Sequence, residues 1–227
     1  MQVPGNDVPG KDIPASTTII PGPPMLSCRK VMTSVIPVLG LFEQTGAYLK
    51  GHFRLTSGLH SPEYLQCALL LQHPKHAETL GKALGEGLSG LVGERKIDTV
   101  VSPAMGGLII GHEVARALGT RHIFTERDAE GKMTLRRGFA IQPGETIVVI
   151  EDVITTGGSS AEVVELLKAS GAEVLGAGSI IDRSGGRASL GVPRIALATL
   201  NVLSWEPAAC PLCAQGQPVV KPGSRPT

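Results

Sequence analysis

The sequence predicts an α/β fold in which a mostly parallel central sheet is flanked by helices and preceded by a small N-terminal hood. From Asp98 onward, short apolar runs alternate with amphipathic segments. Short apolar runs bounded by turn residues are typical of buried strands, and apolar residues spaced three and four apart are typical of helices. The 227-residue chain is also 42% hydrophobic and 18% charged, which supplies enough apolar material for one large core. Strands and helices that alternate in this way form parallel sheets covered on both faces.

The N-terminal third of the chain divides into an extension and the hood. Prolines are frequent in residues 1–32 and apolar periodicity is weak, so this segment is predicted to be a disordered extension. Helical periodicity then runs from Thr33 to about Lys50. In residues 52–71, short apolar runs are broken by TSG and SP, which predicts strands and a turn. We therefore expect residues 33–75 to form an N-terminal helix and the hood.

Residues 76–205 are predicted to form the α/β core. An amphipathic helix over residues 76–92 opens it, and Gly119 and Gly171 are expected to stop the two helices that follow. The expected strands cover residues 98–102, 122–126, 146–150, 173–182 and 194–202, and the two further helices cover residues 108–118 and 160–170.

Bulk composition excludes several classes of partner. The net charge of +1 gives no global basic field and aromatic residues are only 3%, so nucleic-acid binding is not expected. No apolar stretch approaches the roughly 18 residues that a membrane span needs. Asp7, Lys11 and Asp12 interrupt the N-terminal segment, which does not resemble a signal peptide. We expect a cytoplasmic protein with no nucleic-acid or membrane partner, in which local clusters of charge meet any anionic ligand.

The chain has 4 cysteines, of which Cys210 and Cys213 form a close pair in the sequence CPLC. Without a secretory signal, a disulfide framework is not expected. The pair supplies half of a zinc site, and neither a histidine nor a second cysteine pair follows it at the spacing of a zinc finger. The prediction is a C-terminal tail, residues 206–227, in which the pair has a structural or incidental role. No metal-ligating residues are predicted.

The segment IVVIEDVITTGGS, residues 147–159, predicts a ligand site at the edge of the sheet. A strand that ends at Ile150 places Glu151 and Asp152 at its carboxyl end, where open parallel sheets bind ligands. The loop from Thr155 to Ser159 exposes backbone N–H and hydroxyl groups. Ser159 and the glutamate three residues later fit a capping box that opens the next helix. Such a helix N-terminus suits a phosphate monoester.

The two acids restrict the kind of phosphate that this loop can bind. The sequence contains neither the G-x-x-x-x-G-K-[ST] nor the G-x-G-x-x-G fingerprint, and adjacent carboxylates would repel a bare triphosphate. Glu151 and Asp152 can instead accept hydrogen bonds from the vicinal hydroxyls of a ribose, and favour a nearby Mg²⁺ or a developing positive charge on the sugar. The pattern therefore predicts a phosphorylated ribose. By spacing alone, a strand–loop–helix turn with solvated acids is the alternative.

Residues 147–159 resemble the phosphoribosyl pyrophosphate (PRPP) motif of the phosphoribosyltransferases: four apolar positions, two acids, two apolar positions and a small loop rich in hydroxyl groups and glycine. Three further stretches resemble orotate phosphoribosyltransferases in particular. They are the hood segment (residues 53–66), the second ligand loop (residues 102–119) and the mobile catalytic loop (residues 124–139). The resemblance extends from about residue 36 to residue 223.

The resemblance implies a phosphoribosyltransferase-like, Rossmann-like fold and an enzyme that transfers phosphoribosyl from PRPP to orotate, giving orotidine 5′-monophosphate and pyrophosphate in pyrimidine biosynthesis. It also implies Mg²⁺ carried with PRPP, and a homodimer with shared active sites. The implied catalytic residues are Lys132, Arg127 and Asp152. The implied PRPP-binding residues are Arg127, Lys132, Glu151, Asp152, Val153, Ile154, Thr155, Thr156, Gly157, Gly158 and Ser159, and those for orotate are Thr155 and Arg183.

The residues themselves agree with these roles. A lid needs cations to neutralise a departing pyrophosphate, and Arg127 and Lys132 lie in a polar segment between strands where a lid could close. Arg136 and Arg137 adjoin an apolar GF and are interpreted as structural. Arg183 follows an apolar strand, and its guanidinium can match the orotate carboxylate with two parallel hydrogen bonds.

The chain departs from the family at the hood and at the second loop. Thr56 stands where family members carry a lysine, and Met105 and Gly106 stand where they carry a tyrosine and a lysine. Two other functions are alternatives for the same motifs: transfer to another nucleobase, and a PRPP-sensing regulator with the same fold. Few aromatic residues and the presence of Arg183 disfavour a purine enzyme. A regulator would need a basic patch or an added helix-turn-helix, and neither is visible.

Overall fold

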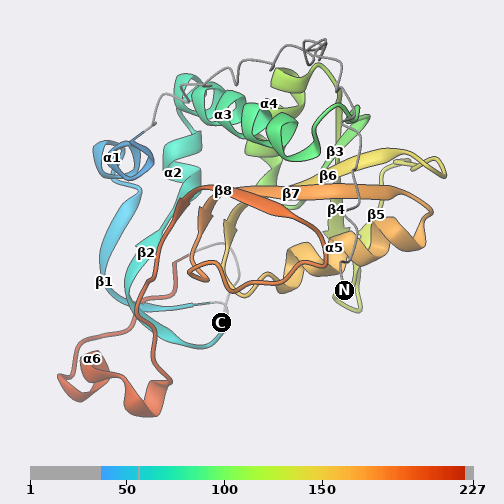
Figure 1. Cartoon of the computed structure of the whole chain (residues 1–227). Helices are drawn as coiled ribbons and strands as arrows, with labels where there is room; N and C mark the ends of the chain where they lie inside the picture. The colour runs from blue at the N-terminus through green and yellow to red at the C-terminus, as the bar shows by residue number, and fades with distance from the viewer. Residues whose placement is uncertain (1–36, 56, 223–227) are drawn as a thin grey trace, which may run out of the picture. The chain divides into compact units, whose positions relative to one another are not determined.

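The computed structural model describes residues 37–55 and 57–222, and within these ranges the central sheet has six strands in the order β5-β4-β3-β6-β7-β8 (Figure 1). All neighbouring pairs are parallel except β4 and β5, which are antiparallel. The strands are β3 (Thr99–Pro103), β4 (Arg121–Arg127), β5 (Met133–Leu135), β6 (Thr146–Ile154), β7 (Glu173–Asp182) and β8 (Arg194–Thr199). The predicted α/β fold with a mostly parallel sheet is confirmed.

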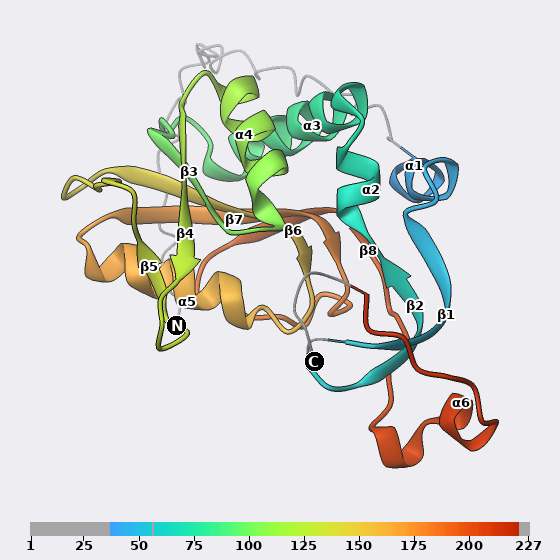
Figure 2. The same cartoon turned by 180° about the vertical axis from the view of Figure 1, so that it is seen from behind.

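Helices cover both faces of this sheet (Figures 1 and 2). The helices α3 (Pro74–Val92) and α4 (Gly107–Leu118) lie on one face, and α5 (Gly158–Ala169) lies on the other. Gly119 and Gly171 follow α4 and α5 with φ angles of 68° and 85°. That left-handed conformation is one that glycine adopts without strain, so both predicted helix stops are confirmed.

Each face of the sheet has its own apolar core. Val100 and Val148 are fully buried on the α3–α4 side, whereas Val101 and Val149, one residue further along the same strands, are buried on the α5 side. Successive side chains of a strand point to opposite faces, so strands buried on both faces need unbroken apolar runs. These two strands were predicted from such runs.

The hood is a two-stranded antiparallel hairpin of β1 (Tyr48–Arg54) and β2 (His60–Leu65), preceded by α1 (Val38–Gln44) and followed by α2 (Cys67–Leu71). The C-terminal segment, with the short helices η1 (Pro207–Ala209) and α6 (Pro211–Ala214), returns to this hairpin. None of the helices in the described ranges has the length and hydropathy needed to cross a bilayer.

Several sequence predictions were wrong in detail. The helix expected from Thr33 to Lys50 ends at Gln44 within the described residues, and Gly46, with a φ angle of 65°, turns the chain into β1. Cys67–Leu71, part of a stretch expected to form strands, is the helix α2. Strand β5 was not predicted, and β6 continues four residues beyond the expected end at Ile150. The predicted N-terminal extension and Thr56 lie outside the described residues.

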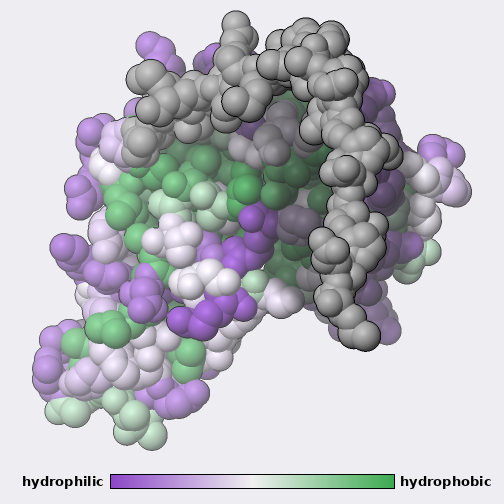
Figure 3. Space-filling model, in the orientation of Figure 1, coloured by the Kyte–Doolittle hydropathy of each residue, from purple (hydrophilic) through white to green (hydrophobic). Residues whose placement is uncertain are grey.

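The β8 edge of the sheet is incompletely covered. Residues 194–198 are all half-buried, unlike the buried strands β3 and β7. In the space-filling view, hydrophobic surface lies between α1 and β8 (Figure 3). Ile195 and Leu197 pack against the core on the α3 side, so the sheet ends here in a strand that contributes to the core from one side only.

The packing of α3 against α4 depends on a glycine. Leu80, Leu84 and Leu88 line the buried face of α3 at helical spacing, and Gly81 lies on the same face. A β-carbon on Gly81 would lie 2.6 Å from Glu113 Cβ and 2.8–2.9 Å from the Glu113 backbone. The two helices are therefore in backbone contact, which only glycine permits.

Gly81→Ala should lower the free energy of unfolding by about 1–3 kcal/mol, because the added methyl group forces the two helices apart. Gly90→Ala is the matched control in the same helix, since an added β-carbon there meets nothing within 4 Å. That change should raise stability by about 0.5–1 kcal/mol through helix propensity. Urea unfolding measures both variants, and effects of the same sign would contradict the close contact.

Candidate active site

Glu151 and Asp152 lie within β6, near its carboxyl end, and both are half-buried. The ladder with β7 continues past them, pairing Glu151 with Ser179 and Ile154 with Asp182. The two acids are therefore held by strand hydrogen bonds. The prediction that the strand ends at Ile150, directly before them, was wrong.

Asp152 lies directly against the start of α4. A β-carbon on Gly106 would lie 2.6–2.7 Å from the carboxyl group of Asp152. A side chain at position 106 would have to displace this carboxylate or alter the backbone of the second loop. Gly106 is one of the positions at which the chain departs from the family. This position of the Asp152 carboxylate therefore requires glycine at position 106. The neighbouring peptide bond between Ala104 and Met105 is cis, and Met105 is 72% exposed.

The acidic pair disfavours its own ionised form. Burial and the Asp152 carboxylate raise the pKa of Glu151 well above the usual glutamate range, and burial also raises the pKa of Asp152. Burial, together with the two nearby carboxylates, raises the pKa of the Cys67 thiol. Among the described residues, no cation lies close enough to the two carboxyl groups to bring their pKa values back down. Positive charge on a ligand would be stabilised here.

The phosphate loop follows β6 directly, and Gly157 sets its shape. Gly157 has a φ angle of 83°, and a β-carbon on it would lie 2.8 Å from Leu190 Cδ2 and 3.2 Å from Ala188 Cβ. Only glycine fits both constraints. Helix α5 begins immediately afterwards, so the first-turn N–H groups lack intrahelical acceptors. These donors adjoin the exposed residues Thr155, Thr156, Gly158 and Ser159 and make an anion site.

The predicted capping box is wrong. The residue that caps α5 is Gly157, with no side-chain hydrogen bond, and Ser159 already lies in the first helical turn. Glu162 instead accepts a hydrogen bond from the backbone N–H of Met133 at 2.8 Å and pairs with Arg127 at 3.1 Å. The carboxylate therefore ties the β4–β5 hairpin to the phosphate loop.

The segment expected to form a lid is this β4–β5 hairpin. Arg127 donates to Ser159 Oγ at 3.4 Å, so its guanidinium lies beside the phosphate loop of its own chain. Lys132 is exposed at the tip, and its backbone N–H is held by Asp128 at 2.8 Å. The Lys132 ammonium has no recorded hydrogen bond or ion pair with the described residues. Arg137 pairs with Glu126 at 2.6 Å, in agreement with a structural role.

Arg183 follows β7 and adjoins the loop, because its backbone N–H donates to Ile154 O at 2.8 Å. Its side chain is half-buried, and burial lowers its pKa from the ordinary arginine value. Nη2 donates to Ser61 Oγ at 3.5 Å, whereas Nε is buried and has no partner among the described residues. This guanidinium faces the hood with unused hydrogen-bonding capacity.

Sequence reasoning missed the hood residues that complete the site. Ser61 contacts Arg183. Burial and the Asp152 carboxylate raise the pKa of Tyr64, whereas the Arg183 guanidinium opposes that rise, so Tyr64 lies near both charged groups. Asp182 was also missed: it accepts hydrogen bonds from Ser184 and pairs with Arg194 at 2.7 Å, which fixes the loop after β7. The sequence showed a hood segment but no signal that selected these side chains.

A half-buried acidic pair, a glycine-shaped anion loop and a cationic hairpin thus meet at one edge of a parallel sheet. Residues 70–191 match the phosphoribosyl transferase domain, so the fold and the loop define a phosphoribosyltransferase. The orotate phosphoribosyltransferase of Desulforamulus reducens is 53% identical over 188 residues, covering 83% of this chain and 96% of that protein. The chain belongs to the orotate phosphoribosyltransferase family, as predicted.

Two further relatives agree. The orotate phosphoribosyltransferase of Thermotoga maritima is 51% identical over 185 residues, covering 82% of this chain and 96% of that protein. The crystal structure of orotate phosphoribosyltransferase from Aeropyrum pernix aligns with a TM-score of 0.60 at 27% identity. That alignment covers 72% of this chain and 93% of the other.

The raised pKa of Glu151 predicts that its ionisation lowers stability as pH rises above the value for an unfolded glutamate. Glu151→Gln should therefore raise the melting temperature at about pH 8, by an amount equivalent to about 1 kcal/mol. At about pH 3 the effect should nearly vanish, since the carboxyl group is then almost fully protonated in both the folded and the unfolded state. Glu86→Gln, on the exposed side of α3, is the control. An equal shift at both pH values would contradict the interpretation.

Proposed function

We propose that this chain transfers the phosphoribosyl group of PRPP to N1 of orotate, giving orotidine 5′-monophosphate and pyrophosphate. The observation that carries this proposal is Arg183. Its guanidinium is half-buried beside the phosphate loop, with a buried Nε that lacks a partner among the described residues. Arginine matches a carboxylate with two parallel hydrogen bonds, and orotate presents a carboxylate next to its reacting nitrogen. Thr155, exposed at the start of the loop, is the second residue assigned to orotate.

The reaction needs no covalent nucleophile. Orotate N1 attacks the anomeric carbon as the bond to pyrophosphate breaks, the N1 proton is released to solvent, and positive charge develops on the ribose in the transition state. Glu151 and Asp152 accept hydrogen bonds from the ribose hydroxyls, and negative charge on the pair stabilises the developing cation. Residues from Thr155 to Ser159 hold the 5′-phosphate through backbone N–H and hydroxyl groups, and Val153 and Ile154 lead into this loop from β6. Arg127 and Lys132 neutralise the leaving pyrophosphate when the β4–β5 hairpin closes over the site.

Mg²⁺ carried by PRPP belongs to the same proposal. The carboxylate oxygens of Glu151 and Asp152 are the hard donors that Mg²⁺ prefers, and their raised pKa values support the placement of a cation beside them. When bound, Mg²⁺ would neutralise charge on the departing pyrophosphate. The protein groups that orient the sugar are the same two carboxylates, so few direct protein ligands are required.

A cytoplasmic location is also part of the proposal, and cell fractionation tests it.

A spectrophotometric assay with PRPP, Mg²⁺ and orotate tests the function directly. Orotate consumption that depends on PRPP is the expected result. Turnover of hypoxanthine or uracil without orotate consumption would assign the chain to another nucleobase. PRPP binding with no turnover of any base would support a regulator that keeps only the fold.

Arg183→Ala should lower kcat/KM for orotate by roughly 10- to 100-fold, because a charge-assisted hydrogen bond contributes about 1.5–3 kcal/mol. PRPP binding by the variant should be nearly unchanged. Arg187→Ala, in the same loop, is the control. Loss of PRPP binding to the same extent as orotate turnover would remove Arg183 from its assigned role.

The functional unit in this proposal is a homodimer in which Arg127 serves the site of the partner. Within the chain, Arg127 pairs with Glu162 at 3.1 Å and contacts Ser159 at 3.4 Å. Reaching a partner therefore requires the hairpin to leave α5. These contacts are partly exposed, and exposed ion pairs contribute only about 0.2–1 kcal/mol each. Such a movement costs little.

Mixed dimers test the shared site. Arg127→Ala and Asp152→Asn chains should each be nearly inactive, because each site would lack one required group. If Arg127 acts across the interface, mixing the two should restore roughly a quarter of wild-type activity, from one intact site in each heterodimer. Lys132→Ala mixed with Asp152→Asn tests the second cation in the same way. No recovery in exchanged dimers would show that the hairpin serves its own chain.

A further inference from the structure

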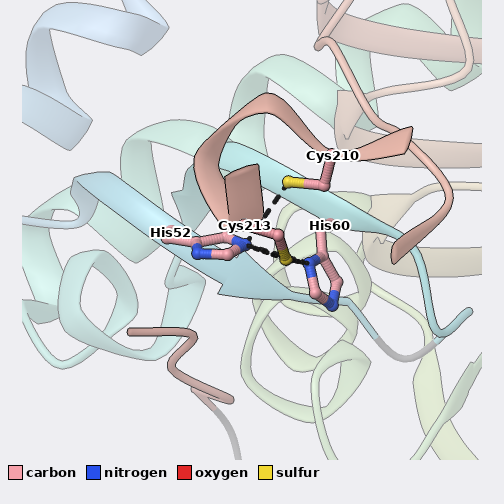
Figure 4. A group of neighbouring side chains, drawn as sticks. All are labelled: His52, His60, Cys210 and Cys213. Atoms are coloured by element: carbon pink, nitrogen blue, oxygen red, sulfur yellow. Dashed lines mark hydrogen bonds between the residues drawn. The ribbon is translucent and has the colours of Figure 1, made fainter. Parts of the chain in front are cut away.

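Four potential metal ligands converge outside the site described above (Figure 4). They are His52 on β1, His60 on β2, Cys210 just before α6 and Cys213 within α6. One ligand atom from each lies within 4.8 Å of all the others. His52, His60 and Cys210 are buried, and Cys213 is exposed. Among the described residues this is the one such group of histidine, cysteine and acidic side chains.

The distances within this cluster approach those of a tetrahedral zinc site. His52 Nε2 lies 2.9 Å from His60 Nδ1, 3.5 Å from Cys210 Sγ and 3.7 Å from Cys213 Sγ. Cys213 Sγ lies 3.3 Å from His60 Nδ1. Tetrahedral zinc with bonds of about 2.0–2.1 Å to nitrogen and about 2.3 Å to sulfur separates its ligands by roughly 3.3–3.8 Å. Small side-chain rotations would therefore bring the four atoms around one ion.

A contact outside the cluster orients His52 for this role. His52 Nδ1 lies 2.9 Å from the carbonyl oxygen of Gln217. A carbonyl only accepts hydrogen bonds, so Nδ1 carries the proton and Nε2 presents its lone pair to the cluster. A hydrogen bond from the second ring nitrogen to a backbone carbonyl is the arrangement that fixes metal-binding histidines.

Without a metal, the same groups would be poorly satisfied. The His60 ring can donate one proton to His52 Nε2, which leaves two thiols with only weak hydrogen bonds. With Zn²⁺, both thiols lose their protons to solvent, and the charge of two thiolates cancels that of the ion. A neutral site of this kind can be buried at little electrostatic cost.

The surrounding segment has little else to hold it in place. From Glu206 to Val220, Cys210 is the one buried residue, and neither η1 nor α6 contains a buried side chain. Backbone hydrogen bonds join its ends to the hood: Trp205 pairs with His60 at 2.8–2.9 Å, and Val220 N donates to His52 O at 2.8 Å. Segments without an apolar core are commonly stabilised by a structural metal.

We infer that His52, His60, Cys210 and Cys213 form a closed, structural Zn²⁺ site that fastens the C-terminal segment to the hood hairpin. Four protein ligands leave no open coordination position, so the ion has no direct part in phosphoribosyl transfer. Its effect on the active site is positional. His60 precedes Ser61, whose hydroxyl donates to Leu203 O at 3.0 Å and accepts from Arg183.

Metal analysis of the full chain, purified after expression with added zinc, tests the inference. Plasma mass spectrometry should find about one zinc ion per chain. Cys213→Ser and His52→Ala should each lower that content at least about tenfold. Cys28→Ser and His73→Gln are controls that change a cysteine and a histidine other than the four proposed ligands, and both variants should retain zinc.

Cobalt exchange of the wild-type protein provides a second reading that does not depend on the folding of a variant. Co²⁺ in this site should give the strong visible absorption of tetrahedral thiolate coordination. Folded wild-type protein that stays free of metal in excess zinc would overturn the inference. A native Cys210–Cys213 disulfide, or full zinc content in Cys213→Ser, would do the same. Because these readings do not involve turnover, their failure leaves the proposed function unaffected.

Discussion

The pairing of β6 with β7 is the interaction on which the rest of the site depends. Two adjacent carboxylates repel each other and lose hydration where they lie, so an isolated loop would let them swing into solvent. Here the parallel ladder continues to Ile154 and Asp182 and holds their backbone in place. The same ladder ends in the hydrogen bond from Arg183 N to Ile154 O, which sets Arg183 beside the phosphate loop. Backbone geometry thus holds the two carboxylates and Arg183 in fixed positions around the loop.

Two of the three candidate cations lie on a different element from the acids. The acids lie within β6 and Arg183 directly follows β7, whereas Arg127 and Lys132 belong to the β4–β5 hairpin. Gly106, against which Asp152 packs, leaves no room for a cation on the second loop in this arrangement. The two acids on β6 therefore have no neutralising cation on the second loop before substrate binds. Charge neutralisation then depends on an element that is held by a few polar contacts.

Most of the fold and half of the site could be predicted from the sequence. Buried parallel strands are unbroken apolar runs, so β3, β6 and β7 were clear, and the acids and loop follow β6 directly. The five residues Cys67–Leu71 are too short a run for periodicity to separate helix from strand. Ser61 contacts Arg183 across 122 positions of sequence, and His52 meets the tail across 165. Proximity between such distant residues is created by the fold, and no local pattern carries it.

The attachment of the tail to the hood has a consequence for how the protein is made. The hairpin β1–β2 is synthesised early, yet its outer edges form isolated bridges with residues near the C-terminus, His60 with Trp205 and Phe53 with Val220. During synthesis on the ribosome, the outer edges of the hood hairpin therefore stay unpaired while the whole core emerges and folds. Contacts of such long sequence separation form late, because the loop entropy must be lost before they contribute. The hood hairpin is therefore completed last, after nearly all of the chain has left the ribosome.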